Sequence, residues 1–300
     1  MPARKRVFPL RPGGPADVAP RWLTRARSAG YTSVRRLTRH SDDGGVRNPP
    51  SPPPCPPGWR IGPPDFVGVG VQRCGTTRWI RLIGSHPEVV WPPAAKELHY
   101  FDRYHLGGCG AREIAGYHEF FPRDGERKVG EWTPLYMSAP WVPALLAQAA
   151  PQARLLVLLR DPVERYISGL QHDSGHAREQ GVSLSRLTPL DAFARGLYHA
   201  QLIRLLSHFD RSQILVLQYE RCVSEPLAEL RKTFQFLGLR DVEFVPDLTI
   251  TPNRQPSKPQ LDAAARDAYV AAYRDDVLAL AQAFPEIDLA LWPNFAPLAG

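Results

Sequence analysis

Cysteine is scarce in this 300-residue chain, and the features that are missing exclude several classes of protein. The four cysteines include no CxxC pair, which argues against a zinc ribbon or a disulfide scaffold and is typical of a reducing compartment. No apolar run approaches the roughly 18–20 residues that a membrane span needs, and the N-terminus lacks an apolar stretch of secretory length. We therefore expect a cytoplasmic protein. The nine histidines show no HExxH spacing, and we expect no metal.

Positive charge is concentrated at the start of the chain. The formal net charge is +7, and residues 1–60 hold eleven Arg and one Lys against three Asp. Residues 61–300 hold 25 basic and 27 acidic residues and are therefore close to neutral. Because the basicity does not belong to the larger part, we expect no nucleic-acid partner for it.

Proline separates a leader from the rest of the chain. Twelve of the 32 prolines lie in residues 1–60, and seven of them fall between positions 49 and 57. Such a run favours polyproline II and excludes a helix. We predict that residues 1–60 form a basic, largely disordered leader and residues 61–300 a folded domain. A basic stretch with interspersed apolar residues at 21–40 leaves open a weak contact with an acidic surface.

The folded part alternates apolar runs with helical patterns. Short β-branched runs predict strands at 65–71, 89–91, 154–159 and 213–218. Apolar spacing and proline positions predict helices at 76–85, 139–149, 162–171, 189–209, 226–237 and 262–284. This alternation indicates an α/β fold in three layers, with a central, mainly parallel sheet flanked by helices. Ligands of such sheets bind beyond the carboxyl ends of the strands.

A glycine-bearing loop, GVQRCGTT at residues 70–77, follows the first strand and opens the first helix. Backbone N–H groups and the helix dipole make such a junction an anion site. Gly70 and Gly75 have the spacing of a P-loop, but Thr76 occupies the position of its lysine. The loop therefore favours a phosphate-type anion without standard ATP hydrolysis. Its expected ligands are Arg73, Cys74, Gly75, Thr76 and Thr77.

A second anion site is predicted at the strand that ends at residue 159. Arg160 follows this strand directly, and Ser168 lies about two helical turns farther along the chain. An arginine can hold a phosphate through two parallel hydrogen bonds, and the serine hydroxyl would complete the site. Arg165 competes for this role, although it could equally pair with Asp161 or Glu164 as a structural ion pair.

With both sites in this order, the chain resembles sulfotransferases that use 3′-phosphoadenosine 5′-phosphosulfate (PAPS) over residues 65–295. The resemblance implies a P-loop-like fold in which the 70–77 loop holds the 5′-phosphosulfate. It also implies that Arg160 and Ser168 hold the 3′-phosphate, which distinguishes PAPS from ATP. Segments 96–102 and 131–136 are similar to parts of the heparan sulfate 3-O-sulfotransferases.

The resemblance also implies a catalytic arrangement without a metal. Arg73, where many members have lysine, would meet the leaving oxygen. Members of the group place a glutamate base in the region of Glu97, and His99 is the second candidate. An extended segment would bring these two side chains to one face and turn Leu98 to the other. Arg254 is expected in a basic loop that closes over the nucleotide.

The acceptor is the least determined part of this interpretation. The heparan group carries lysine where this chain has Trp132, which suggests an acceptor less acidic than heparan sulfate. We expect an acceptor hydroxyl on a carbohydrate, a lipid or a natural product. Two alternatives remain open: a P-loop-like nucleotide kinase, which the missing lysine disfavours, and a non-catalytic nucleotide-binding module.

Overall fold

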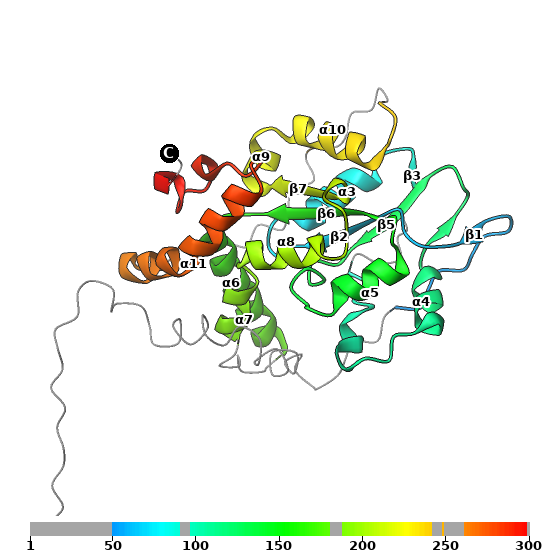
Figure 1. Ribbon diagram of the computed structural model, residues 1–300, viewed down its shortest axis with the longest axis horizontal. Helices are drawn as coiled ribbons and strands as arrows, with labels where there is room; N and C mark the ends of the chain where they lie inside the picture. Colours follow the sequence, from blue (N-terminus) through cyan, green and yellow to red (C-terminus); the bar gives the residue numbers. More distant parts are fainter. Residues whose placement is uncertain (1–49, 91–96, 181–187, 242–247, 249–260, 299–300) are drawn as a thin grey trace, which may run out of the picture.

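The structure, a computed structural model, describes residues 50–90, 97–180, 188–241, 248 and 261–298, with side chains omitted at 174–180 (Figure 1). Most of the predicted leader and Arg254 lie outside the described residues. Within the described ranges, no helix combines the length and the apolar character that crossing a bilayer requires.

Five parallel strands form the central sheet, in the order β3-β5-β2-β6-β7. They are β2 (Phe66–Gly70), β3 (Val89–Val90), β5 (Lys128–Trp132), β6 (Arg154–Leu159) and β7 (Ile214–Gln218). A separate antiparallel pair joins β1 (Arg60–Ile61) to β4 (Pro122–Arg123). Because the five strands are parallel, their carboxyl ends lie along one edge of the sheet, where the predicted anion sites belong.

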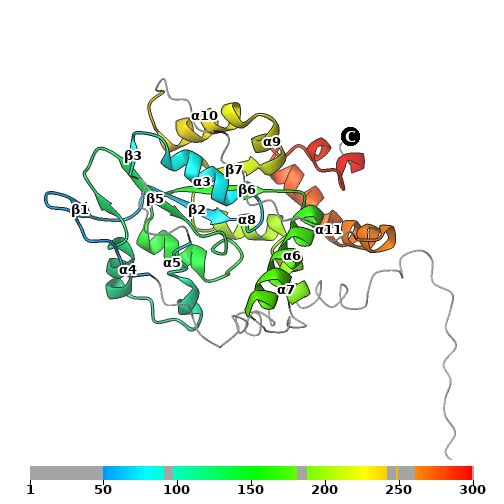
Figure 2. The same ribbon diagram turned by 180° about the vertical axis from the view of Figure 1, so that it is seen from behind.

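Helices cover both faces of the sheet. They are α3 (Thr76–Gly84), α4 (Ala111–His118), α5 (Val142–Ala149), α6 (Pro162–Gln180), α7 (Thr188–Ala194), α8 (Tyr198–Leu206), α9 (Tyr219–Ser224), α10 (Pro226–Leu237) and α11 (Ala263–Ala283). Figures 1 and 2 show α3 and α10 on one side of the sheet and α5 and α8 on the other. A hydrogen bond of 3.2 Å from the Trp79 indole to the Thr233 hydroxyl joins α3 to α10. The three-layer α/β architecture is therefore confirmed.

The structure corrects several predicted boundaries. The predicted helix at 189–209 is two helices, α7 and α8, because the chain turns at Gly196. A Cβ on Gly196 would lie within 3 Å of the Tyr273 side chain, so this close approach requires glycine. Helix α6 runs nine residues beyond the predicted end at 171, and α5 begins at Val142 rather than at 139. Strand β5 and helix α4 were not predicted at all.

Candidate functional site

The 70–77 loop turns sharply from β2 into α3 at Gly75. Gly75 has φ +86°, in the left-handed region, and a Cβ there would lie 2.9 Å from the Tyr219 ring. Only glycine satisfies both conditions. In the part of the chain that the structure describes, no side chain caps the start of α3. The first N–H groups of this helix are therefore suited to an anion.

The structure brings together the three side chains that the sequence analysis assigned to two separate anion sites. Arg73 Nε donates a hydrogen bond of 3.2 Å to Ser168 Oγ on α6. Arg160, directly after β6, donates from Nη1 to the carbonyl oxygen of Arg73 over 3.4 Å. The loop after β2 and the junction after β6 therefore form one continuous polar site.

The two arginines concentrate positive charge at this edge of the sheet. Burial lowers the pKa of Arg73, and the neighbouring cation of Arg160 lowers it further. Arg160 lies over the Tyr219 ring, 4.9 Å from its centroid, and 3.9 Å from the Glu164 carboxylate. Two guanidinium groups so close together repel each other, and an anion bound between them would relieve that repulsion.

Arg165 takes neither of the roles considered for it. Its side chain is fully buried and donates to the carbonyl oxygen of Ala192, so it pairs with neither Asp161 nor Glu164. Asp161 instead caps α6, because its carboxylate accepts the backbone N–H groups of Val163 and Glu164 at 2.9 and 3.2 Å.

The donor groups of Cys74 are engaged within the loop. Its N–H donates to Val71 O at 3.3 Å, and its thiol lies 3.9 Å from Gln72 O. The side chain is fully buried, and burial raises the pKa of the thiol to about 12. It therefore remains a thiol rather than a nucleophilic thiolate at neutral pH. Thr76 is buried as well, whereas Thr77 is partly exposed at the start of α3.

Three ionisable side chains form a short chain beside the loop. The imidazole of His99 lies between two carboxylates, with Nδ1 2.7 Å from Asp102 Oδ2 and Nε2 3.5 Å from Glu97 Oε2. The expected extended backbone is wrong, because Glu97 and His99 both adopt the left-handed region, with φ of +68° and +51°. The side chains nevertheless meet, and Leu98 between them is buried in the core.

The charge of His99 separates the two candidates for a base. Burial disfavours the imidazolium, but hydrogen bonds to Asp102 and Glu97 outweigh burial and raise the pKa of His99 to about 9. At neutral pH a doubly protonated imidazole has no lone pair with which to accept a proton. Glu97 therefore remains the better candidate, and its carboxylate is close enough to Arg73 to oppose a part of the lowering of the Arg73 pKa that burial and Arg160 cause.

Trp132 lies in the core and does not line an acceptor surface. Its side chain is fully buried, and its indole Nε1 donates to Gly70 O over 3.2 Å. The ring covers Gly68 so closely that a Cβ there would overlap it. The suggestion that Trp132 makes the acceptor side less cationic is therefore not supported by its position. Tyr136 is equally buried.

Two polar contacts near the site were missed. Glu131 on β5 is buried and accepts hydrogen bonds from the Tyr117 and Thr133 hydroxyls. Arg195 donates to the Gln72 side chain in the loop and pairs with Asp191. Segment 131–136 stood out in the sequence, but its resemblance implied no role for Glu131. The bond from Arg195 to Gln72 joins residues 123 positions apart, which no local pattern reveals.

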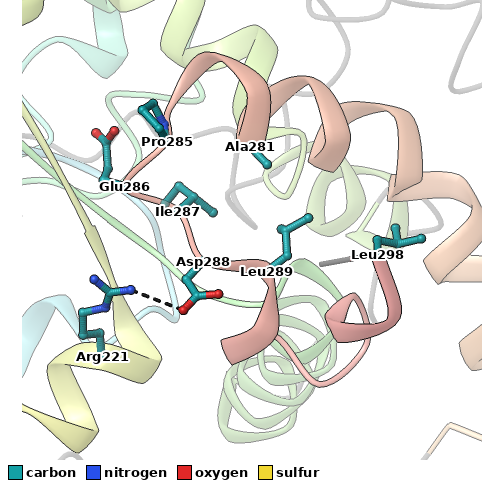
Figure 3. A pocket seen from close by; sticks show the side chains of 8 residues that line it. All are labelled: Arg221, Ala281, Pro285, Glu286, Ile287, Asp288, Leu289 and Leu298. Atoms are coloured by element: carbon teal, nitrogen blue, oxygen red, sulfur yellow. Dashed lines mark ion pairs between the residues drawn. The ribbon is translucent and has the colours of Figure 1, made fainter. Parts of the chain in front are cut away.

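A surface depression lies elsewhere, between α9 and the segment that follows α11. It is lined by Arg221, Ala281, Pro285, Glu286, Ile287, Asp288, Leu289 and Leu298 (Figure 3). Arg221 and Asp288 form an ion pair of 3.5 Å within it. The depression shares no residue with the arginines or with the carboxylate–imidazole chain, and we do not assign it to the site.

Comparisons with known proteins identify the proteins that this chain resembles. A family model described as "Sulfotransferase family" matches residues 116–243. The chain is 32% identical over 192 residues to heparan sulfate glucosamine 3-O-sulfotransferase 3A1 of Mus musculus, covering 60% of this chain and 47% of that protein. It is 31% identical over 239 residues to 3-O-sulfotransferase 6 of Mus musculus, covering 76% and 64%. The chain thus spans about half to two thirds of the length of these curated relatives.

One solved structure is similar over almost its whole length. The crystal structure of a sulfotransferase from Alicyclobacillus acidocaldarius matches with a TM-score of 0.63 and 26% sequence identity. The match covers 77% of this chain and 99% of that one.

Proposed function

Because this chain belongs to the sulfotransferase family, we propose that it is an enzyme that moves a sulfuryl group from PAPS to an acceptor hydroxyl. The observation that carries the proposal is the contact of Arg73 with Ser168 and of Arg160 with the Arg73 backbone. This contact joins the two predicted anion sites at the carboxyl edge of a parallel sheet, where a donor with two separate phosphate groups needs them.

The polar groups at this edge have the chemistry that PAPS requires. Arg160 and Ser168 would bind the 3′-phosphate, and the open N-terminus of α3 with Thr76 and Thr77 would bind the 5′-phosphate. The two guanidinium groups supply donors only, and the serine and threonine hydroxyls can donate as well, which suits a polyanion. Arg254, which lies outside the described residues, is proposed as a further residue that binds PAPS.

The transfer itself needs little covalent help from the protein. PAPS supplies a sulfuryl group that is bonded to a phosphate oxygen, and this phosphate is a good leaving group. The acceptor oxygen forms a bond to sulfur while the bond from sulfur to the phosphate oxygen breaks. Arg73 would stabilise the negative charge that develops on that oxygen. Positioning the acceptor in line with the breaking bond supplies much of the remaining rate enhancement.

Glu97 would take the proton of the acceptor hydroxyl. The proposal is supported by its partly exposed carboxylate and by the charge of its neighbour, since His99 already holds its proton at neutral pH. His99, held by Asp102, would fix the orientation of Glu97. A base in this position typically contributes about 10²–10⁴-fold to the rate.

The relatives act, by their names, on glucosamine units of heparan sulfate. For this chain we propose the broader class of hydroxyl-bearing acceptors, namely a carbohydrate, a lipid or a natural product. Because Trp132 lies in the core, we do not use it to exclude an acidic acceptor. We retain a cytoplasmic location as part of the proposal.

Calorimetric titration with adenosine 3′,5′-bisphosphate, ADP and ATP tests the donor site directly. We expect the bisphosphate to bind at least about tenfold more tightly than ADP, because only it offers a phosphate to Arg160 and Ser168. Equal affinities would overturn the donor assignment, and turnover of ATP with Mg²⁺ would favour the kinase alternative. Transfer from labelled PAPS to a panel of glycans, sterols and phenols would then identify the acceptor.

A further inference from the structure

Glu131 is a buried carboxylate that lies behind the carboxylate–imidazole chain rather than within it. It lies near the carboxyl end of β5 and is 2% exposed. Both oxygens accept hydrogen bonds, Oε1 from the Tyr117 hydroxyl at 2.9 Å and Oε2 from the Thr133 hydroxyl at 2.6 Å. The nearby Tyr136 hydroxyl also favours the charged form of this carboxylate.

Two of these three hydroxyls, those of Thr133 and Tyr136, also accept a hydrogen bond from a backbone N–H group. Thr133 Oγ1 accepts the backbone N–H of His99 at 3.4 Å, and the Tyr136 oxygen accepts the backbone N–H of Tyr100 at 2.9 Å. Thr133 gives its proton to Glu131 and offers a lone pair to the backbone of His99. The direction of the Thr133 bonds therefore depends on the carboxylate.

The segment that they hold is a strained one. His99 has a positive φ, which costs a residue other than glycine energy unless its surroundings impose it. A third bond, from Glu97 N–H to the carbonyl oxygen of Trp132 at 3.1 Å, also ties this segment to the end of β5. The end of β5 thus fixes the backbone from which Glu97 and His99 project.

Charge links the same groups. Burial raises the pKa of Glu131 to about 7, while the hydrogen bonds from Thr133, Tyr117 and Tyr136 and the nearby cation of His99 favour its anion. The groups facing Glu131 are therefore one hydroxyl from α4, two hydroxyls that follow β5, and His99. His99 is the cation in this group of described residues.

We propose that Glu131 is a positioning residue for sulfuryl transfer, which acts through the Thr133 hydroxyl to hold His99 between Glu97 and Asp102. The inference rests on the proposed function, because it assigns Glu131 to the support of the base. Glu131 itself is buried and touches neither donor nor acceptor. Its removal should lower kcat and leave donor binding unchanged.

Thr133→Val tests the link with little change of shape. We expect kcat to fall about tenfold or more, since small displacements of a catalytic group are costly, while the affinity for adenosine 3′,5′-bisphosphate stays within twofold. Thr133→Ser, which keeps the hydroxyl, should retain most of the activity, and Glu131→Gln should resemble Thr133→Val. Tyr117→Phe is the matched control, because it removes a hydroxyl from the same carboxylate without touching the 99–100 backbone, and kcat should stay within about twofold.

A second readout does not depend on transferase activity. NMR titration of isotope-labelled histidine in the full chain, with His99 assigned from His99→Gln, follows the imidazole directly. Glu131→Gln should lower the pKa of His99, and Tyr117→Phe should leave that pKa unchanged. If the labelled histidine shifts as expected but no acceptor is sulfated, the proposed function fails and the structural link stands. If Thr133→Val keeps full kcat, or Tyr117→Phe loses as much as Thr133→Val, Glu131 is part of the core only.

Discussion

Arg73 Nε lies 3.2 Å from Ser168 Oγ, although 95 positions separate the two residues in the sequence. One of them belongs to the loop after β2 and the other to α6, so this bond ties the two halves of the donor site together. Because Ser168 accepts from Arg73, it can donate its own proton to a bound 3′-phosphate at the same time. Occupation of one half would thereby be coupled to the geometry of the other.

Ser168→Ala should weaken binding of adenosine 3′,5′-bisphosphate by about tenfold, the usual value of one lost hydrogen bond. ADP, which lacks the 3′-phosphate, should lose little. Calorimetric titration measures both ligands. Ser138→Ala is the control, because the Ser138 hydroxyl donates to the nearby carbonyl oxygen of Leu135. Equal losses for ADP and the bisphosphate would contradict the assignment of Ser168.

Arg160→Ala should have a larger effect on the same ligand, about 10–100-fold, because a charge-assisted bond is lost. Arg160→Lys should recover part of the affinity, since lysine keeps the charge but not the paired geometry. Arg211→Ala is the control: it also removes one positive charge, but from an ion pair with Glu286 that lies outside the proposed site. The assignment fails if Arg211→Ala and Arg160→Ala weaken the bisphosphate equally.

The raised pKa of His99 predicts a stability that depends on pH. A group whose pKa is raised on folding stabilises fully below its unfolded value of about 6.5 and loses that contribution as the pH rises through about 9. The difference in unfolding free energy between the native chain and His99→Gln should therefore shrink by at most about 3 kcal/mol over this interval. Urea denaturation at several pH values measures it, and a constant difference would contradict the imidazolium assignment.

Gly75→Ala should weaken ligand binding at the loop and Gly107→Ala should not. Both glycines have positive φ, but a Cβ on Gly75 meets the Tyr219 ring at 2.9 Å, whereas nothing lies within 4 Å of one on Gly107. Gly75→Ala should cost about 1–3 kcal/mol of stability and weaken the bisphosphate further. Alanine is strained at both positions, so both variants should lose stability. Thermal unfolding with and without ligand compares the pair, and an equal loss of the ligand-induced shift would contradict the role of the loop.

Trp132→Lys should not create a cationic acceptor surface. The new ammonium group would be buried over Gly68 in the core, so we expect a loss of about 3 kcal/mol or more. Trp132→Phe, which keeps a ring and loses the bond to Gly70, should cost less. Urea denaturation ranks the two variants. A stable Trp132→Lys protein with improved activity on sulfated glycans would show that this position faces the acceptor.

The sequence predicted the elements whose patterns are local. Strand β6, with its RLLVLL run, is apolar enough to stand out, and Arg160 at its end follows from the parallel arrangement. Strand β5 reads KVGEW, with a lysine and a glutamate, and its burial depends on neighbours that no local pattern reveals. The roles of Trp132 and Arg165 were open for the same reason, because packing decides whether a tryptophan or an arginine faces solvent or the core.

The order of the strands has a consequence for how such a protein changes its substrate. Strand β2 lies between β6, which leads to Arg160 and α6, and β5, which supports the Glu97–His99 segment. The groups proposed to bind the donor therefore follow β2 and its neighbour β6, and the proposed base lies on the other flank of β2. A transplant of residues 97–136 from a relative would exchange one flank as a block and keep the other intact. The fold should therefore accept chimaeras that use the same sulfuryl donor and differ in their acceptor.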